Sequence, residues 1–353
     1  MYVKLLTRTL FQVDSKIKNI FRMNYEVAIV IPTLNEEHFI SRCLNSIIKQ
    51  TYEFEKMDVM IIDGGSNDNT KEIVAEYQKS HQNIRFIENK KKIQSVAFNI
   101  GTNNSTAPYI IRLDAHAEYD SEYISLCIEN LKDDKKRGNV GGRCNILPFN
   151  QSVWAQTNAI LNHSRFGIGG AAFRVSNEAH NTDSVPFGAF PRRIIEEIGG
   201  MREDLPRGED NEYNSRIRKA GYQVYFNPDI ISSYYARPTL KASCKQMYAN
   251  GESIGYLYYI DKEAIGLRHL IPLLFVVCIF IGIILSLLWN PFCYLLEGGL
   301  AVYFIAAAVA AITETTRNKK CTLPLFILFF CVHVSYGIGT ISGLTKGKKN
   351  HNR

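Results

Sequence analysis

Hydrophobic runs and amphipathic segments alternate through the first two thirds of the chain. Short continuous apolar runs predict buried strands at residues 27–31, 59–62, 84–87 and 109–113. Segments with apolar residues three and four positions apart predict helices between them, at 40–48, 73–77 and 94–103. Strands that alternate with helices in this way predict an α/β fold, with a mainly parallel, Rossmann-like sheet covered by helices.

The C-terminal quarter follows a different pattern, because charged residues almost disappear from it. Glu297 is the only charged residue between positions 270 and 312. Buried helices of soluble proteins seldom run so far without a charge. Three uncharged stretches are each long enough to cross the core of a bilayer, at about 270–289, 292–312 and 323–344. We therefore expect a domain at 25–240, a juxtamembrane linker helix at 241–269 and a transmembrane region at 270–345.

Basic residues near these stretches suggest how they cross the membrane. The positive-inside rule places Arg317, Lys319 and Lys320 in the cytoplasm. The first two stretches then form a hairpin, and residues 1–269 are cytoplasmic as well. Three complete crossings would place the basic tail at 346–353 outside, against the same rule. Either the third stretch is re-entrant or interfacial, or the tail departs from the rule.

The first 24 residues combine an apolar stripe with positive charge. Apolar residues recur every three or four positions from Val3 to Ile20, and most basic residues lie off that stripe. This pattern is typical of an amphipathic basic helix on an anionic membrane surface, although an ordinary helix packed on the next domain would also show it. Asp14 and Lys16 interrupt the apolar run, so we do not expect a signal peptide.

The formal charge of +7 over 353 residues comes from the two ends of the chain. Residues 1–24 carry +4, residues 25–269 carry −2, and residues 270–353 carry +5. A nucleic-acid-binding domain would concentrate basic residues on its globular part, so we expect no nucleic-acid partner. The eight cysteines form no C-x-x-C pair and predict neither a metal cluster nor a disulfide framework, which fits a reducing compartment.

Polar and acidic side chains gather where three of the predicted strands end. Because ligands of open α/β sheets bind outside the carboxyl ends of the strands, these segments should face one crevice. Taken singly, each has a plainer explanation as a helix cap, a turn or a surface acid. The segments are Pro32-Thr33-Leu34-Asn35-Glu36-Glu37, Asp63-Gly64-Gly65-Ser66-Asn67-Asp68-Asn69-Thr70 and Asp114-Ala115-His116.

These motifs resemble those of the family 2 glycosyltransferases, which use nucleotide sugars and have the GT-A fold. Residues 32–36 match the family's P-x-x-N-E turn, residues 63–70 are similar to its D-G-S-x-D-x-T segment, and residues 208–210 read Gly-Glu-Asp. The resemblance covers about residues 26–260. More narrowly, the chain resembles the bacterial succinoglycan and capsular-polysaccharide branch with C-terminal spans, at 114–117, 166–169, 186–190 and 245–251.

The resemblance implies roles for the strand-end residues on the donor side. Five residues would contact the nucleotide sugar, namely Pro32, Thr33, Glu36, Asp63 and Asp114. Asp114 would also hold a divalent cation, Mn²⁺ or Mg²⁺, that stabilises the leaving diphosphate. His116 stands where the family's D-x-D motif usually has its second acid, and imidazole suits Mn²⁺ better than Mg²⁺. His116 is therefore either a second metal ligand or a hydrogen-bonding group for phosphate or the acceptor sugar.

The resemblance also implies a general base for the acceptor hydroxyl. Inverting members of the family use an Asp at the position of Asp210, and Glu209 would be its neighbour or support the metal. By itself, an acidic pair at the start of a helix needs no function, because the helix dipole favours it. The basic run at 90–92 either contacts phosphate or forms a solvated loop.

Together these features predict an inverting, metal-dependent hexosyltransferase with its catalytic domain on the cytoplasmic side of the cell membrane. It would move a sugar from a nucleotide sugar, such as a UDP-hexose, to a lipid-linked saccharide in exopolysaccharide or capsule synthesis. The chain lacks a Q-x-x-R-W segment, which favours single additions over the alternative of a processive polysaccharide synthase. A catalytically silent membrane scaffold that binds nucleotide sugar is the other alternative.

Overall fold

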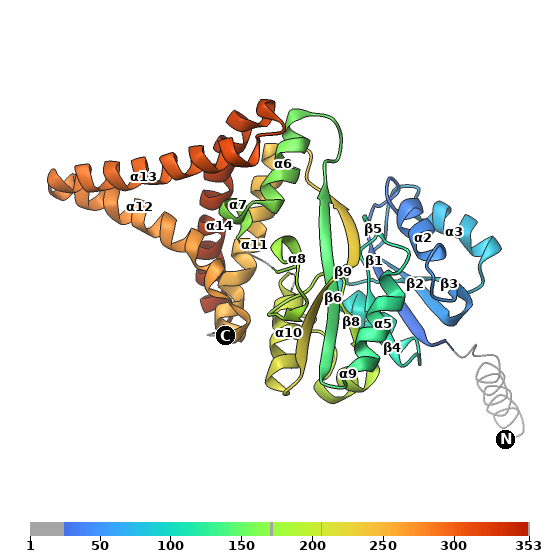
Figure 1. Cartoon of the computed structure of the whole chain (residues 1–353). Helices are drawn as coiled ribbons and strands as arrows, with labels where there is room; N and C mark the ends of the chain where they lie inside the picture. Colours follow the sequence, from blue (N-terminus) through green and yellow to red (C-terminus); the bar gives the residue numbers. More distant parts are fainter. Residues whose placement is uncertain (1–24, 170–171, 206, 352–353) are drawn as a thin grey trace, which may run out of the picture.

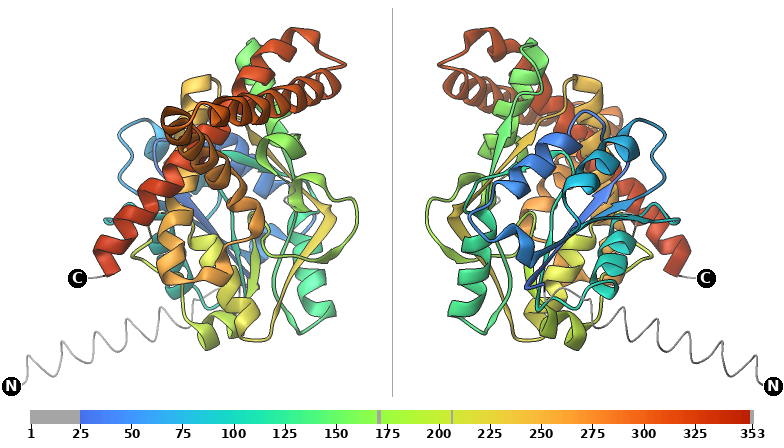
Figure 2. Two further views of the ribbon diagram at one scale, coloured as in Figure 1. Left: turned by 90° about the vertical axis from the view of Figure 1, so that its left-hand side faces the viewer. Right: turned by 90° about the vertical axis from the view of Figure 1, so that its right-hand side faces the viewer.

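The computed structural model describes residues 25–169, 172–205 and 207–351 (Figure 1). The amphipathic helix predicted at 1–24 lies outside these residues. An α/β domain built on one sheet is followed by a group of long helices, which stand together on one side of the domain (Figure 2).

One half of the sheet is parallel. β1 (Val27–Thr33) lies between β2 (Met57–Asp63) and β4 (Tyr109–Arg112), and β3 (Ile84–Glu88) lies outside β2. All seven residues of β2 are buried, as a strand covered on both faces requires. The four predicted strands are confirmed, each within two residues of its expected bounds.

The other half of the sheet is mixed. From β4 it continues through β8 (Ala189–Pro191), β6 (Arg137–Leu147), β9 (Gln223–Tyr235) and β5 (Ala117–Tyr119), and β7 (His180–Asn181) also pairs with β9. β6 and β9 are parallel, whereas the other pairs in this half are antiparallel. The predicted α/β fold is confirmed. The strand–helix alternation fades here because β5, β7 and β8 are only two or three residues long.

Helices cover both faces of the sheet. Ile29 and Ile31 of β1 belong to the core under α2 (Ile40–Ile48), α3 (Thr70–Ser80) and α5 (Tyr123–Asp133). Ala28 and Val30 belong to the core under α4 (Gln94–Asn103), α9 (Arg192–Ile198) and α10 (Glu209–Lys219). This division follows from the alternation of side chains along a strand.

Long helices form most of the chain after β9. α11 (Leu240–Ile260) leads through two short 3₁₀ turns, η2 (Lys262–Ala264) and η3 (Leu267–His269), to α12 (Ile271–Leu288). α13 (Pro291–Glu314) and α14 (Thr322–His351) follow. Three helical stretches are long and apolar enough to cross a membrane, at Leu267–Leu288, Pro291–Glu314 and Lys319–Lys348. α12 and α13 form a hairpin that stands away from the domain (Figure 1).

The second half of α14 lies directly against α11. A Cβ atom on Gly251 of α11 would come within 2.0 Å of the carbonyl oxygen of Tyr336, and one on Gly343 of α14 within 2.0 Å of that of Glu252. Because a larger side chain would collide with the opposing main chain, glycine lets these two helices approach closely.

The first half of α14 contacts the α/β domain. Phe329 packs in one buried cluster with Leu161 of α6 (Val153–His163). The Nε2 atom of His333 lies 3.0 Å from the carbonyl oxygens of Phe166 and Gly167 in α7 (Arg165–Ile168). α14 is therefore attached to the domain and to α11 along its length, unlike the α12–α13 hairpin.

Candidate active site

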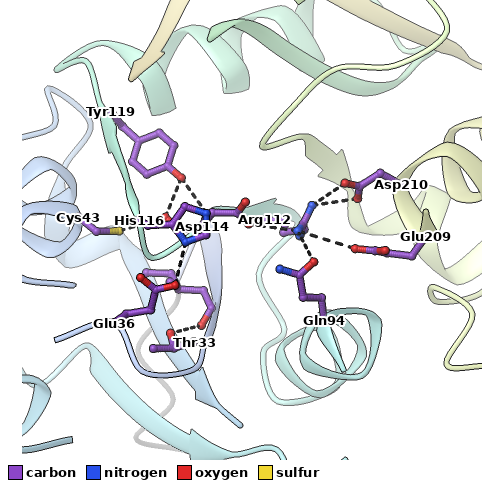
Figure 3. Close-up of polar contacts among 11 residues, drawn as sticks. Thr33, Glu36, Cys43, Gln94, Arg112, Asp114, His116, Tyr119, Glu209 and Asp210 are labelled. Carbon is purple, nitrogen blue, oxygen red and sulfur yellow. Dashed lines mark hydrogen bonds and ion pairs between the residues drawn. The ribbon is translucent and has the colours of Figure 1, made fainter. Parts of the chain in front are cut away.

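The polar segments that follow β1, β2 and β4 meet at the carboxyl edge of the parallel half of the sheet. The backbone N–H of Asn35 donates to Ser66 Oγ at 2.8 Å, and that of Glu36 donates to Thr70 Oγ1 at 2.9 Å. The third segment joins them through His116, whose Nδ1 lies 2.8 Å from Glu36 Oε1 (Figure 3). The structure therefore brings together the three segments that the sequence placed at strand ends.

Asp63 and Thr33 shape the loops where the sequence predicts that the donor binds. One carboxylate oxygen of Asp63 accepts from the N–H groups of Gly65 and Ser66, at 2.8 and 2.9 Å, and the other accepts from Ser66 Oγ at 2.5 Å. The hydroxyl of Thr33 donates to the carbonyl oxygen of Ile31. Both side chains are buried and hold the main chain at the edge of the sheet, with the half-buried Pro32 beside them.

His116 is oriented by Glu36. Burial alone would lower the pKa of His116, but its hydrogen bond to Glu36 and the charges of Asp114 and Glu36 raise the pKa overall. The ring also meets Tyr234 of β9 edge to face, with the ring centres 5.2 Å apart. Because Nδ1 is engaged by Glu36, Nε2 is the ring nitrogen left to meet a ligand.

Arg112, at the end of β4, is a site residue that the sequence analysis missed. Its Nη1 atom donates to both carboxylate oxygens of Asp210, at 2.9 and 2.8 Å, and its Nη2 atom donates to Asp114 Oδ1 at 3.1 Å and to Gln94 Oε1 at 3.3 Å. Only 5% of the residue is exposed. Burial would lower the pKa of Arg112, yet Asp210, Asp114 and Glu209 raise it overall, so the guanidinium stays charged. Figure 3 shows Arg112 between the two candidate carboxylates.

The acidic pair at the start of α10 consists of two carboxyl groups in different surroundings. Gly208 precedes the pair with φ 84°, a left-handed conformation that suits glycine and turns the chain into the helix. Glu209 is 4% exposed, and burial followed by repulsion from Asp210 raises its pKa despite the nearby Arg112. The side chain of Asp210 is 42% exposed. Asp210 is therefore the more accessible of the two carboxyl groups.

The donor-side residues fit a cation that is shared with a phosphate ligand. Within the described residues, no three His, Cys, Asp or Glu side chains gather around one point. Mg²⁺ and Mn²⁺ sites that also bind substrate phosphates need only one or two protein ligands. Asp114 supplies one carboxylate, and a His116 ring held by Glu36 has the carboxylate–imidazole arrangement common in metal sites.

Strained main chain is concentrated around this site. Among the described residues other than glycine, only Asn35, Lys92 and Phe187 have positive φ values, at 56°, 59° and 48°. Asn35 belongs to the first polar segment, Lys92 lies against Gly64 and Gly65 of the second, and Phe187 lines a recess beside Arg112 and Asp210. Strain of this kind is often retained at functional sites.

The fold is that of the GT-A glycosyltransferases. A mannosyltransferase from Pyrobaculum calidifontis, solved in complex with GDP-Man and Mn²⁺, shares the fold with a TM-score of 0.59. That likeness covers 88% of this chain and 86% of the other, at 18% sequence identity.

Sequence comparison identifies the family. Residues 28–199 match the model of Glycosyl transferase family 2. A dolichyl N-acetyl-α-D-glucosaminyl phosphate 3-β-D-2,3-diacetamido-2,3-dideoxy-β-D-glucuronosyltransferase from Methanococcus voltae is 30% identical, over 92% of this chain and 98% of that protein. The chain belongs to glycosyl transferase family 2.

A second relative confirms the narrower resemblance. Succinoglycan biosynthesis protein ExoA from Rhizobium meliloti is 27% identical over 247 residues, which cover 69% of this chain and 74% of that protein. The family expected from the sequence motifs is therefore confirmed, and so is the resemblance to a succinoglycan protein.

Proposed function

We propose that this protein is an inverting, metal-dependent glycosyltransferase that adds one sugar at a time to a lipid-linked saccharide. The donor would be a nucleotide sugar such as a UDP-hexose, and the product would serve exopolysaccharide or capsule synthesis. The arrangement around Arg112 carries this proposal, because Arg112 lies between Asp114 on the donor side and Asp210 on the acceptor side. The name of the first relative supports the acceptor class, since it includes a dolichyl phosphate, and the name of the second, which includes succinoglycan, supports a role in polysaccharide synthesis.

On the donor side, the residues at the strand ends would bind the nucleotide diphosphate. Asp114, with His116 held by Glu36, would share a Mg²⁺ or Mn²⁺ ion with the diphosphate, and such an ion stabilises the charge that develops there as the sugar leaves. The rigid loops held by Asp63 and Thr33 form the adjoining rim, against which the nucleoside would rest.

On the acceptor side, Asp210 would act as the general base. The acceptor oxygen attacks the anomeric carbon as the bond to the diphosphate oxygen breaks, and the hydroxyl proton passes to Asp210. Arg112 holds the Asp210 carboxylate in place through two hydrogen bonds before the donor arrives. Attack from the face opposite the leaving group inverts the configuration at that carbon.

We also propose that only the α12–α13 hairpin crosses the bilayer. The 18 residues of α12 give a helix about 27 Å long, close to the thickness of a bilayer core. Trp289 and Tyr294 at the tip of the hairpin are exposed and suit the far interface. The contacts of α14 with α6, α7 and α11 favour its staying on the side of the catalytic domain.

This arrangement removes the conflict between the charge pattern and three crossings. The basic loop after α13 and the basic tail would then lie on the same side as the catalytic domain. That side is the cytoplasm by the positive-inside rule. The third apolar stretch would be interfacial, which is one of the two alternatives that the sequence left open.

The function is tested by offering a panel of nucleotide sugars to membranes that contain the chain. We expect one donor class to be consumed with formation of one glycolipid product, and a chelator to stop the reaction until Mn²⁺ or Mg²⁺ is restored. A ladder of product lengths from one acceptor would contradict single addition. Unchanged rates in chelator would contradict the role of Asp114.

A further inference from the structure

Arg174, in the short helix α8 (Ala172–Val175), carries a buried charge that needs a partner. Its Nε and Nη1 atoms are inaccessible to solvent and have no hydrogen-bond partner in the part of the chain that the structure describes. Its recorded contact is with the ring of Phe173, 5.1 Å from the guanidinium carbon to the ring centre. A buried guanidinium without a counter-charge is costly, so its retention points to an anionic ligand.

The groups around Arg174 do not supply that anion. Cys144 on β6 and Tyr234 on β9 are its nearest titratable neighbours, together with Arg268 of η3. Burial raises the pKa of Cys144 to about 11, so its thiol is neutral at physiological pH. No Asp or Glu is among the described groups that act on Arg174, and Asp183, an acid that contacts Arg268, pairs with it at 2.6 Å. The positive charge of Arg174 is therefore in excess.

Arg174 lies near residues of two different regions. One neighbour is Tyr234, which pairs with Ala117 across β5 and β9 and meets the ring of His116. Another is Arg268, which comes three residues before α12 begins. A ligand that reaches from the bilayer surface to the reacting groups would pass this point.

We propose that Arg174 binds the phosphate group of the lipid-linked acceptor. This inference rests on the proposed function and names the part of the acceptor that the enzyme holds. A phosphate attached to a lipid lies at the membrane surface, where the α12–α13 hairpin begins, and its sugar extends toward the catalytic carboxylates. Phosphate accepts charge-assisted hydrogen bonds from guanidinium. The unpartnered Nε and Nη1 atoms are closed to solvent, so the phosphate would reach them by displacing the groups that cover them.

Kinetics with the full chain in membranes test this assignment. Arg174→Gln should raise the KM for the lipid acceptor about tenfold or more, as expected when one charge-assisted hydrogen bond is lost. The KM for the nucleotide sugar should stay unchanged. The acceptor KM of Arg174→Lys should lie between those of the wild type and Arg174→Gln. Arg165→Gln is the matched control, because Arg165 is exposed and lies nine residues earlier in the same region.

Each other kinetic outcome overturns the proposal. A rise in the KM for the nucleotide sugar would assign Arg174 to the donor diphosphate instead. Unchanged values of both constants would leave Arg174 without a ligand role. If Arg174→Gln does not fold, Arg174→Lys carries the test, since it keeps the charge but loses the planar donors and should still raise the acceptor KM.

A binding measurement separates this proposal from the proposed function. Farnesyl phosphate, with farnesol as the uncharged control, is titrated into the purified full chain. We expect the phosphate to bind and Arg174→Gln to weaken it about tenfold, with farnesol unaffected. Binding that depends on Arg174 in a chain without transferase activity would refute the function and keep the site. If the chain has transferase activity but Arg174→Gln binds farnesyl phosphate as tightly as the wild type, the site would be refuted and the proposed function kept.

Discussion

At the scale of single residues, three carboxyl groups surround one guanidinium. Arg112 contacts Asp114 and Asp210 directly, and Glu209 Oε1 lies 3.9 Å from its Nη2 atom. The two acids of α10 nevertheless differ. Glu209 is buried with a raised pKa, whereas the side chain of Asp210 is partly exposed. We therefore expect Glu209 to stabilise the site and Asp210 to take the proton of the acceptor hydroxyl.

The two acids of α10 should respond differently to amidation. Asp210→Asn removes the general base, so kcat should fall by roughly 10²- to 10⁴-fold while the donor still binds. Glu209→Gln changes a buried side chain that is not the candidate base, so kcat should stay within about tenfold of wild type. Initial rates and donor-binding measurements on both variants distinguish them. The reverse order of effects would move the base to Glu209.

Loss of Arg112 should harm both stability and activity. Arg112→Met leaves the buried Glu209 facing Asp210 without a counter-charge. Because Asp210 is partly exposed, we expect the lower end of the cost of breaking a buried ion pair, about 3 kcal/mol. Arg202→Met is the control, since its pair with Asp204 is exposed and worth less than about 1 kcal/mol. Denaturant unfolding in detergent measures the free energy of unfolding of both variants. Equal losses of this free energy would contradict the special role of Arg112.

At the scale of elements, α11 holds the helix that carries the candidate base. At the start of α10, Arg207 Nε donates to Asn250 Oδ1 of α11 at 2.8 Å, and Gly208 packs against Ser253. At the end of α10, Lys219 Nζ lies 2.6 Å from Asp261, just after α11. α14 packs against α11, so the apolar C-terminal helices also help to position α10.

The glycine contacts between α11 and α14 should therefore matter for catalysis. Gly251→Ala would force a Cβ atom against the carbonyl oxygen of Tyr336 and separate the helices, at a cost of about 1–3 kcal/mol. We expect a lower unfolding temperature and a lower kcat. Gly298→Ala on α13 is the matched control, because a Cβ there meets no atom within 4 Å. Equal behaviour of the two variants would show that the close approach is unimportant.

At the scale of the whole molecule, charge and hydrophobicity divide the chain into a catalytic part and a membrane part. The domain and linker at 25–269 carry −2, whereas 270–353 carry +5. With a two-span hairpin, the positive charge after α13 and in the tail would lie on the side of the catalytic domain. It would then face the anionic lipids of the cytoplasmic leaflet.

The orientation of the hairpin and of α14 can be measured with single cysteines. In a background with the native cysteines replaced, Asn290→Cys at the hairpin tip should react with an impermeant maleimide added to intact cells. Thr345→Cys near the end of α14 should react only after the membrane is opened. Labelling of Thr345→Cys from outside would instead support three crossings.

Much of the fold could be predicted because its signals are local. The apolar runs of β1 to β4 and the periodic face of α4 depend on nearby residues alone, and they predicted these elements to within two residues. The short strands β5 and β8 have no such pattern. They exist because β4, β6 and β9 offer free edges, which is a property of the assembled sheet.

By itself, the sequence determined the class of fold, the family and the polar segments at the strand ends, because strand order and motif spacing place these residues at one edge. Only the tertiary structure decided how they are connected. Arg112 and Asp210 are 98 residues apart, and no local pattern pairs them. Likewise, length and hydropathy made α14 a candidate span, whereas its contacts with α11 depend on glycines that meet only in three dimensions. Local sequence patterns decide where helices and strands form. The tertiary fold decides which buried charges pair and which helices pack closely.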